Sequence, residues 1–343
     1  MLAKLPPDEP MSSFNAIRVH QGAAGVRATL EALEHQPLSA GEVSVRVAYS
    51  GLNFKDALAI TGRGAIMRSY PRVAGIDLAG VVEASEDAAF APGDRVIATG
   101  AGLGEWLDGG LAEYARVPAD ALLTLPVGLS LFEAMALGTA GFTAALALRR
   151  MLENHQEPAQ GPIVVTGATG GVGSIALMLL AGAGFKTAAL TGKPEAAAYL
   201  RDLGAASVLE RSALETGTKP LEKAVWGGAV DNLGGEVLAY LTRTVRPWGN
   251  IACIGLAQSA QLHTTVMPLI LRGVSLLGIH SVQVPRPWRE ALWGLLAGPW
   301  KPPRLESRLV RSVISLEQVA EAAQELIAGR AKGRYVVRIA GEN

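Results

Sequence analysis

The sequence contains a single cysteine, Cys253, in 343 residues. One cysteine excludes a disulfide within the chain and any zinc site built from several thiolates. The histidines show no metal-ligand spacing, and we expect each to be a surface or packing residue; they are His20, His35, His155, His263 and His280. The sequence therefore predicts no metal site.

The chain also lacks an excess of charge of either sign, because 31 lysines and arginines balance 31 aspartates and glutamates. Balanced charge gives no field that would favour nucleic acid or an anionic membrane. No run of 18 uncharged apolar residues without glycines suggests a transmembrane helix, and residues 1–10 carry prolines and charges instead of the apolar centre of a signal peptide. We expect a cytoplasmic protein that binds a small molecule, with no nucleic acid and no membrane as partner.

A chain of this length can form two domains, each with its own core. In its first part, short alternating segments are separated by glycine and proline, which is typical of a barrel-like β domain. These segments are 14–19, 43–47, 75–82, 92–97 and 109–114. Farther on, six strand-like runs alternate with helix-like segments and predict a doubly wound parallel sheet of six strands. The runs are 163–166, 185–190, 207–209, 229–231, 251–254 and 274–279.

Local signals suggest where the two domains meet. Ser130-Leu131-Phe132-Glu133 is a capping box that opens a long helix through Arg150, and residues 298–303 have the composition of a linker. A second capping box begins at Ser315, and the last strand-like run, 335–339, should return to the first domain, since the parallel sheet is already complete. We assign residues 11–129 and 304–343 to the β-rich domain and residues 130–303 to the parallel-sheet domain.

The apolar run 163–166 ends in small residues, and an apolar helix-like stretch, 175–180, follows at once. A dinucleotide-binding fingerprint requires this strand–turn–helix context. Small residues let the backbone approach a pyrophosphate, whose charge is met by free N–H groups at the helix start. A glycine-rich turn without a ligand is the alternative, but the flanking segments favour a nucleotide site. Its residues are Ala168, Thr169, Gly170, Gly171, Val172 and Gly173, with alanine where the first glycine of the motif is usual.

Residues at the end of the second strand of such a sheet contact the ribose of the coenzyme. An acidic residue there favours NAD, whereas a cation favours the 2′-phosphate of NADP. Here the chain has Thr191-Gly192-Lys193 and no acid until Glu195. Lys193 could equally be a solvated turn lysine, but the missing acid favours NADPH.

Several segments together resemble a known family. They are Asn53–Gly62 (NFKDALAITG), Gly75–Gly80 (GIDLAG), Gly109–Glu113 (GGLAE), Gly138–Ala144 (GTAGFTA) and Thr264–Pro268 (TTVMP). The chain is similar to the medium-chain dehydrogenase/reductase superfamily, in its zinc-free quinone-oxidoreductase-like division, and looks most like the acrylyl-CoA reductases. The resemblance implies an α/β protein with a GroES-like catalytic domain and a Rossmann domain. It also implies NADPH, an active site in the cleft between them, and a homodimer formed by pairing the edge strands of two sheets.

The resemblance also assigns roles to single residues. Gly75-Ile76-Asp77 stands where the zinc enzymes of the superfamily have Gly-His-Glu, so the resemblance implies catalysis without zinc. Asn53 and Phe54 are the implied catalytic residues. Relatives commonly have tyrosine in place of Phe54; phenylalanine keeps a ring beside the nicotinamide but cannot donate a proton, so protonation would come from water or another group. Further coenzyme contacts are implied for Phe54 itself, Arg211, Leu256, Ser281 and Arg334, although each could be a packing or cleft residue.

Three arginines, Arg63, Arg68 and Arg72, lie in a loop expected at the mouth of the cleft. Guanidinium groups bind phosphates bidentately, so these residues could hold coenzyme A, or they could simply be solvated loop cations.

The function implied is NADPH-dependent reduction of the carbon–carbon double bond of acrylyl-CoA to propanoyl-CoA. An NADPH-dependent quinone or enone oxidoreductase is one alternative. A non-catalytic NADPH-binding redox sensor or structural protein is another.

Overall fold

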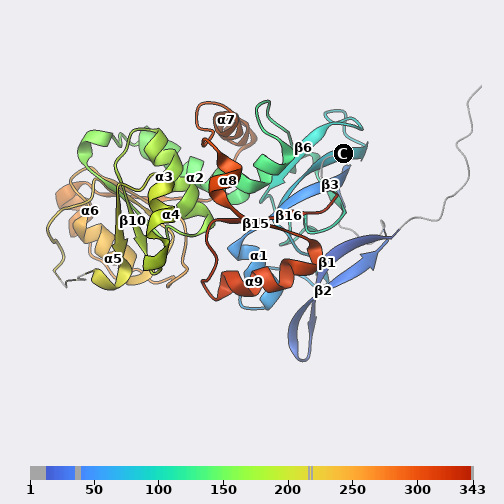
Figure 1. Ribbon diagram of the computed structural model, residues 1–343, viewed down its shortest axis with the longest axis horizontal. Coiled ribbons are helices and arrows are strands. Elements are labelled where there is room, and N and C mark those ends of the chain that lie inside the picture. Colours follow the sequence, from blue (N-terminus) through green and yellow to red (C-terminus); the bar gives the residue numbers. More distant parts are fainter. Residues whose placement is uncertain (1–12, 35–39, 215–216, 218, 341–343) are drawn as a thin grey trace, which may run out of the picture.

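The computed structural model describes residues 13–34, 40–214, 217 and 219–340. His35 and residues 1–10, whose composition argued against a signal peptide, lie outside this part of the chain. The described residues form three β sheets with helices between them (Figure 1).

The six-stranded sheet is parallel throughout, in the order β11-β10-β9-β12-β13-β14. This confirms the predicted doubly wound sheet, with strand bounds that differ from the prediction by at most two residues. The strands are β9 (Ile163–Thr166), β10 (Thr187–Thr191), β11 (Ser207–Glu210), β12 (Gly228–Asp231), β13 (Asn250–Cys253) and β14 (Ser275–Gly278). The helices between them are α3 (Gly171–Gly182), α4 (Ala197–Asp202), α5 (Gly235–Thr244) and α6 (Met267–Arg272).

The order of the strands reverses direction at β9, because β10 lies on one side of it and β12 on the other. In open sheets of this kind, ligands bind outside the carboxyl ends of the strands at such a switch point. The turn that carries the predicted fingerprint leaves β9 at this place.

The seven-stranded sheet has the order β15-β16-β3-β5-β6-β8, with β7 also paired to β3. Its strands are β3 (Val43–Leu52), β5 (Asp77–Ser85), β6 (Arg95–Thr99), β7 (Tyr114–Val117), β8 (Leu123–Thr124), β15 (Val310–Ile314) and β16 (Arg334–Arg338). The pairing of Val336 with Gly51 confirms that the last strand returns to the first part of the chain. A third, small sheet contains β1 (Phe14–Gly22), β2 (Gly25–Leu33) and β4 (Arg72–Val73); its β1–β2 hairpin projects from the molecule (Figure 1).

The strand predicted at 109–114 was wrong over most of its length, since β7 begins only at Tyr114. Gly109 and Gly110 pack backbone against backbone instead. A Cβ on Gly109 would lie 2.3 Å from the carbonyl oxygen of Gly75, and one on Gly110 would lie 2.3 Å from that of Asp77. The glycines therefore allow a close approach of two chain segments that a strand of larger residues could not make.

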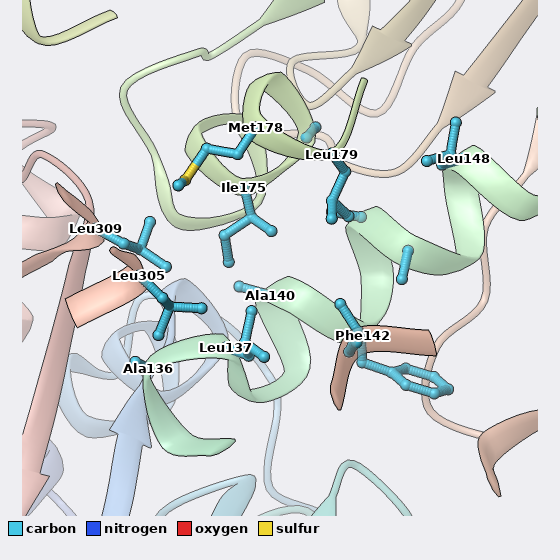
Figure 2. Packing of buried hydrophobic residues seen from close by; sticks show 14 of the residues in the cluster. Ala136, Leu137, Ala140, Phe142, Leu148, Ile175, Met178, Leu179, Leu305 and Leu309 are labelled. Carbon is cyan, nitrogen blue, oxygen red and sulfur yellow. The ribbon is translucent and has the colours of Figure 1, made fainter. Parts of the chain in front are cut away.

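The long helix α2 (Leu131–Glu153) connects the two larger sheets. Its predicted capping box is confirmed: the Glu133 N–H donates to the Ser130 hydroxyl at 3.0 Å, and the Ser130 N–H donates to the Glu133 carboxylate at 3.0 Å. Figure 2 shows apolar side chains of α2 packed against α3 and α8 (Leu305–Leu309). By length and composition α2 could cross a membrane, but 83% of its most apolar window is buried inside the protein, so the core accounts for its composition.

The remaining α-helices of the described residues are α1 (Phe54–Thr61), α7 (Arg286–Ala297) and α9 (Val319–Ile327). The second capping box is present at Ser315, where it opens a short 3-10 turn that leads into α9. All strands of the six-stranded sheet fall within residues 130–303, and those of the other sheets fall outside this range. The division of the chain at 129/130 and 303/304 agrees with this arrangement and stays a prediction.

Candidate coenzyme and active site

The turn after β9 leaves the start of α3 open. The first helical bond of α3 runs from the Ser174 N–H to the carbonyl of Gly170, at 2.9 Å, so the N–H groups of the three residues before Ser174 have no acceptor within the helix. Gly170 is the N-cap residue and is exposed, and as a glycine it brings no side chain that could cap these groups. Such a helix start fits a pyrophosphate, which accepts hydrogen bonds from free N–H groups and is attracted by the helix dipole.

The last glycine of the fingerprint has a packing reason. A Cβ on Gly173 would lie 2.5 Å from the carbonyl oxygen of Gly167 and 2.8 Å from the Cα of Ala168. Any larger residue would push the helix away from the strand. The residue types of the fingerprint therefore fit the close strand–helix approach that a dinucleotide requires.

The predicted ribose turn follows β10. Thr191 is buried, and its hydroxyl accepts the N–H of Lys193 at 3.0 Å, which fixes the turn. The ammonium group of Lys193 is half-buried and donates to the carbonyl of Ala331. Arg211 is exposed and its guanidinium lies against the turn, since a Cβ on Gly192 would be 3.9 Å from Arg211 Nη2. The structure thus brings both predicted ribose-phosphate cations to one turn.

Arg334 lies in a buried polar network instead of on an open surface. It is at the start of β16, Asp77 is at the start of β5, and β3 runs between the two strands. Gly51 of β3 makes room for their contact: a Cβ there would lie 2.6 Å from Arg334 Nη2 and 3.0 Å from Asp77 Oδ2. Arg334 Nη2 is 3.7 Å from Asp77 Oδ2, and its Nη1 donates to the side-chain oxygen of Asn53 at 2.9 Å.

The remaining donors of Arg334 are directed at backbone carbonyls, those of Ala136, Leu52 and Met135. A Cβ on Gly171 would lie 3.0 Å from Arg334 Cδ, and the Gly333 N–H donates to the carbonyl of Thr169 at 2.9 Å. Arg334 and the residue before it therefore pack against the fingerprint turn and hold it in place. The predicted direct contact between Arg334 and a coenzyme stays a prediction, because these protein acceptors already engage its guanidinium.

The same network holds Asn53 and the start of α1. Asn53 is 8% exposed, and its amide nitrogen donates to Asp77 Oδ2 at 2.8 Å and to the carbonyl of Gly51 at 3.1 Å. Its backbone N–H donates to Asp56 Oδ2 at 2.8 Å. With its side chain engaged in this way, Asn53 is placed to fix α1, and its predicted catalytic contact stays a prediction.

Two buried carboxyl groups share this region with a single guanidinium. Asp77 accepts from the N–H of Thr139 at 2.9 Å, and α2 leaves helical geometry beside it at Gly138 (φ 51°, ψ −155°), where a Cβ would lie 2.4 Å from Asp77 Oδ2. Asp56 accepts the backbone N–H groups of Asn53 and Ile76, the latter at 2.9 Å. Burial and the nearby charge of Asp77 raise the pKa of Asp56 to about 7. Burial also raises the pKa of Asp77, but Arg334 opposes this, so a shared proton belongs on Asp56.

Phe54, the first residue of α1, keeps 43% of its surface exposed although Asn53 and Asp56 beside it are buried. Leu256, after β13, is 65% exposed. Ser281 belongs to a segment that reaches the end of β6, because the Ala101 N–H donates to the carbonyl of Val282 at 3.3 Å. These placements are compatible with a cleft between the two larger sheets, and the roles of the three predicted residues stay predictions.

The three loop arginines have different surroundings. The Arg72 guanidinium pairs with Asp108 at 3.5 Å and donates to the Ser69 hydroxyl at 2.6 Å, so its charge is already used within the protein. The guanidinium carbon of Arg68 lies 4.4 Å from the centre of the Trp106 ring, a cation–π contact. Arg63 is exposed. Of the three, Arg63 and Arg68 are better placed than Arg72 to receive a phosphate.

Among the residues that the structure describes, no group of three histidine, cysteine, aspartate or glutamate side chains could hold a metal ion. His20 contacts Glu31 and His263 contacts Glu236, each a pair on the surface or partly buried. Burial raises the pKa of Cys253 to about 11, so its thiol stays protonated at neutral pH.

Asp56 and Thr139 were not predicted as members of the central network, and the helix α1 itself was not predicted either. A signal for α1 was present, because asparagine at 53 and aspartate at 56 have the spacing of a capping box. An aspartate directly before the apolar residues 78–82 of β5 was a signal for Asp77. The partners of these residues had no such local signal.

Comparisons with known proteins agree with this architecture. Residues 39–127 match the family described as Alcohol dehydrogenase GroES-like domain, and residues 171–297 match the family described as Zinc-binding dehydrogenase. The putative quinone oxidoreductase YhfP of Bacillus subtilis is 45% identical over 95% of this chain and 99% of its own. Acrylyl-CoA reductase AcuI of Ruegeria pomeroyi is 42% identical over 95% of this chain and 99% of its own.

A solved structure shows the same similarity over nearly the whole chain. The yhdH oxidoreductase from Salmonella enterica, in complex with NADP, superposes with a TM-score of 0.91 at 43% identity and covers 95% of this chain and 99% of its own. The likeness extends over both parts of the chain, the GroES-like part and the Rossmann part. The chain therefore belongs to the medium-chain dehydrogenase/reductase superfamily, in the group that contains these acrylyl-CoA reductase and quinone oxidoreductase relatives.

Proposed function

We propose that this protein is an NADPH-dependent reductase of the carbon–carbon double bond of acrylyl-CoA, with propanoyl-CoA as the product. The observation that carries the coenzyme part is the start of α3, whose N–H groups are free of a side-chain cap and lie beside the turn with Lys193 and Arg211. Relatives that align over nearly their whole length support the substrate, because two that are each 42% identical are named acrylyl-CoA reductase or probable acrylyl-CoA reductase.

Bound NADPH would supply a hydride, and the chain's own residues would provide binding, orientation and electrostatics. The first turn of α3 would hold the pyrophosphate, and Lys193 with Arg211 would hold the 2′-phosphate. The Arg334–Asp77 network would keep the fingerprint turn and the start of α1 in a fixed relation. The exposed ring of Phe54 would form an apolar wall for the short acyl group.

Reduction of an unsaturated thioester places negative charge on the thioester oxygen, and this charge must be met by hydrogen-bond donors. The α-carbon is then protonated. Phe54 has no proton to give, and Asp56 is almost fully buried within the first turn of α1, so we assign this proton to water. In this mechanism the protein needs neither a metal ion nor a nucleophile.

A quinone oxidoreductase is the second candidate, and two observations favour it. YhfP carries that name at 45% identity. In addition, the ion pair between Arg72 and Asp108 leaves fewer cations in the loop for coenzyme A than the sequence suggested.

A steady-state comparison of acrylyl-CoA, free acrylate, acrolein and a small quinone tests the proposal. If coenzyme A is the handle that positions the acyl group, kcat/KM for acrylyl-CoA should exceed that for free acrylate by far, and Arg63→Ala and Arg68→Ala should lower it. The same substitutions should leave acrolein almost unaffected, and Arg338→Ala, at the far end of β16, provides a matched loss of charge. If kcat/KM is higher for quinones than for acrylyl-CoA, and neither loop substitution changes it, the protein is a quinone reductase and this proposal is wrong.

We also propose a homodimer. β14 is an edge strand of the six-stranded sheet, and the neighbouring helix α6 exposes apolar side chains. These are Val266 (62% exposed), Met267 (40%), Ile270 (73%) and Leu271 (61%). Edge pairing of β14 with β14 of a second copy would continue the sheet and cover this face. Light scattering should give a dimer mass for the unaltered protein and a monomer mass for Ile270→Asp.

A further inference from the structure

One short segment of the chain contacts both coenzyme turns. Residues 331–333, which lead into β16, receive a hydrogen bond from Lys193 at the carbonyl of Ala331. Two residues later, the Gly333 N–H donates to the carbonyl of Thr169, in the fingerprint turn, at 2.9 Å. Lys332 is thereby held between the turn that faces the ribose phosphate and the turn that faces the pyrophosphate.

Positive charge gathers at this place. Val310 of β15 pairs with Arg334 of β16, which brings the next residue, Arg311, near the segment 331–333. Burial lowers the pKa of Lys193, the nearby Glu195 opposes this, and the charges of Lys332 and Arg311 lower it further. Arg311 also interacts with the Tyr335 hydroxyl. Lys332 Nζ lies 3.8 Å from a carboxylate oxygen of Glu195, but the Glu195 side chain is 62% exposed, so water screens the pair. Bringing like charges together costs free energy unless an anion joins them.

The cations come from two different sheets. Lys193 and Arg211 follow strands of the six-stranded sheet, whereas Arg311 lies on β15 and Lys332 precedes β16, both in the seven-stranded sheet. An anion bound among them would therefore be held from both sides of the junction between the sheets. A phosphate monoester carries about −1.5 to −2 charges near neutral pH and accepts several charge-assisted hydrogen bonds.

We propose that Lys332 and Arg311 complete the site for the 2′-phosphate of NADPH, so that this phosphate is bound by both sheets at once. The proposal rests on the proposed function, since it needs NADPH as the coenzyme. It adds that residues outside the Rossmann part contribute to coenzyme preference, because they contact the 2′-phosphate that NADH lacks.

Titration calorimetry with two coenzyme fragments, 2′,5′-ADP and 5′-AMP, tests this on the full chain. Both carry the adenosine, but only 2′,5′-ADP has the 2′-phosphate. Lys332→Gln should weaken 2′,5′-ADP about tenfold, as expected for one lost charge-assisted contact, and Arg311→Gln should act in the same direction. 5′-AMP should bind as before, which also shows that the variants are folded, and Lys332→Arg should restore the affinity.

Two controls distinguish the ways in which the idea can fail. Arg338→Gln removes an exposed charge at the other end of β16 and should change nothing. If 2′,5′-ADP binds tightly, loses affinity in Lys193→Gln, but keeps it in Lys332→Gln and Arg311→Gln, the two-sided site is wrong and the proposed function stands. If the unaltered protein binds both fragments equally, the assignment of NADPH fails as well.

Discussion

The helices α1 and α3 each follow a strand, and their first turns are built in opposite ways. At the start of α1, the backbone N–H of Asn53 is taken by Asp56, and the Asn53 side chain is bonded to Asp77 and Arg334. At the start of α3, Gly170 offers no side chain, and the first N–H groups are left without a cap. The closed start holds the structure together, and the open start is suited to a ligand.

Arg334 links the two helix starts. Its Nη1 reaches Asn53 at one of them, and its Cδ lies against Gly171 at the other. The open start therefore depends on the closed one: a buried ion pair holds in position the turn whose N–H groups would meet a phosphate.

Breaking the closed start should have the largest effect. Asp77→Ala leaves the guanidinium of Arg334 buried without its carboxylate, and losing one partner of a buried pair typically costs about 3–5 kcal/mol. Urea unfolding measures the loss in the free energy of unfolding. Glu153→Ala is the control, since it removes one partner of an exposed pair with Arg149 and should cost under about 1 kcal/mol. A loss as small as that of the control would show that the network is not a main support of the fold.

Capping the free N–H groups at the start of α3 should have the second largest effect. Gly170→Asp adds an acceptor for the free N–H groups, and its Cβ meets nothing closer than the Gly167 carbonyl oxygen at 3.3 Å. The helix should gain a few tenths of a kcal/mol, whereas NADPH should bind at least about tenfold more weakly, because a carboxylate replaces the pyrophosphate. Fluorescence titration and thermal unfolding measure the two effects. Gly22→Asp adds the same charge on the exposed hairpin and should change neither the NADPH affinity nor the thermal stability. Unaltered NADPH affinity in Gly170→Asp would show that the phosphate does not bind at this turn.

The fold could be predicted from the sequence much further than the site. Apolar periodicity and small-residue turns are local, so the six parallel strands, the fingerprint and the capping box at Ser130 could be predicted. The network around Arg334 joins residues 281 positions apart, Asn53 and Arg334, and others 24 apart, Asn53 and Asp77. No local pattern encodes such partners, because they meet only after both sheets have formed.

The loop arginines illustrate the same limit. In the sequence, Arg63, Arg68 and Arg72 are equivalent cations, yet the fold gives Arg72 a carboxylate partner, Asp108, and gives Arg68 the face of Trp106. Whether a charge is free to bind a ligand depends on tertiary neighbours. A pattern of residue types therefore predicts the location of a charged loop better than the function of its members.

A third prediction concerns the proton within the closed start. The pKa of Asp56 is raised to about 7 in the folded protein, against 3.8 for an ordinary aspartate. A raised carboxyl pKa means that the folded state binds the proton more tightly, so this group's contribution to stability is present at low pH and is lost as the pH rises from about 4 to about 7. The slope is at most about 1.4 kcal/mol per pH unit. Urea unfolding between pH 4 and 8 should show this loss in the unaltered protein and not in Asp56→Asn; parallel curves would mean that Asp56 is charged throughout.

The smallest effect is expected at Phe54, the exposed first residue of α1. Because the polar groups around it are engaged in the closed start, Phe54 should act as a surface and not as a chemical group. Phe54→Tyr keeps the ring and adds a hydroxyl, so kcat should change less than about threefold and the pH profile should keep its shape, whereas Phe54→Ala should raise KM by removing the wall. A tenfold rise of kcat in Phe54→Tyr, with a new ionisation in the profile, would show instead that protonation limits the reaction and that a hydroxyl at this position can supply the proton. That result would assign a chemical role to the closed helix start, which the contacts around Asn53 otherwise limit to a structural one.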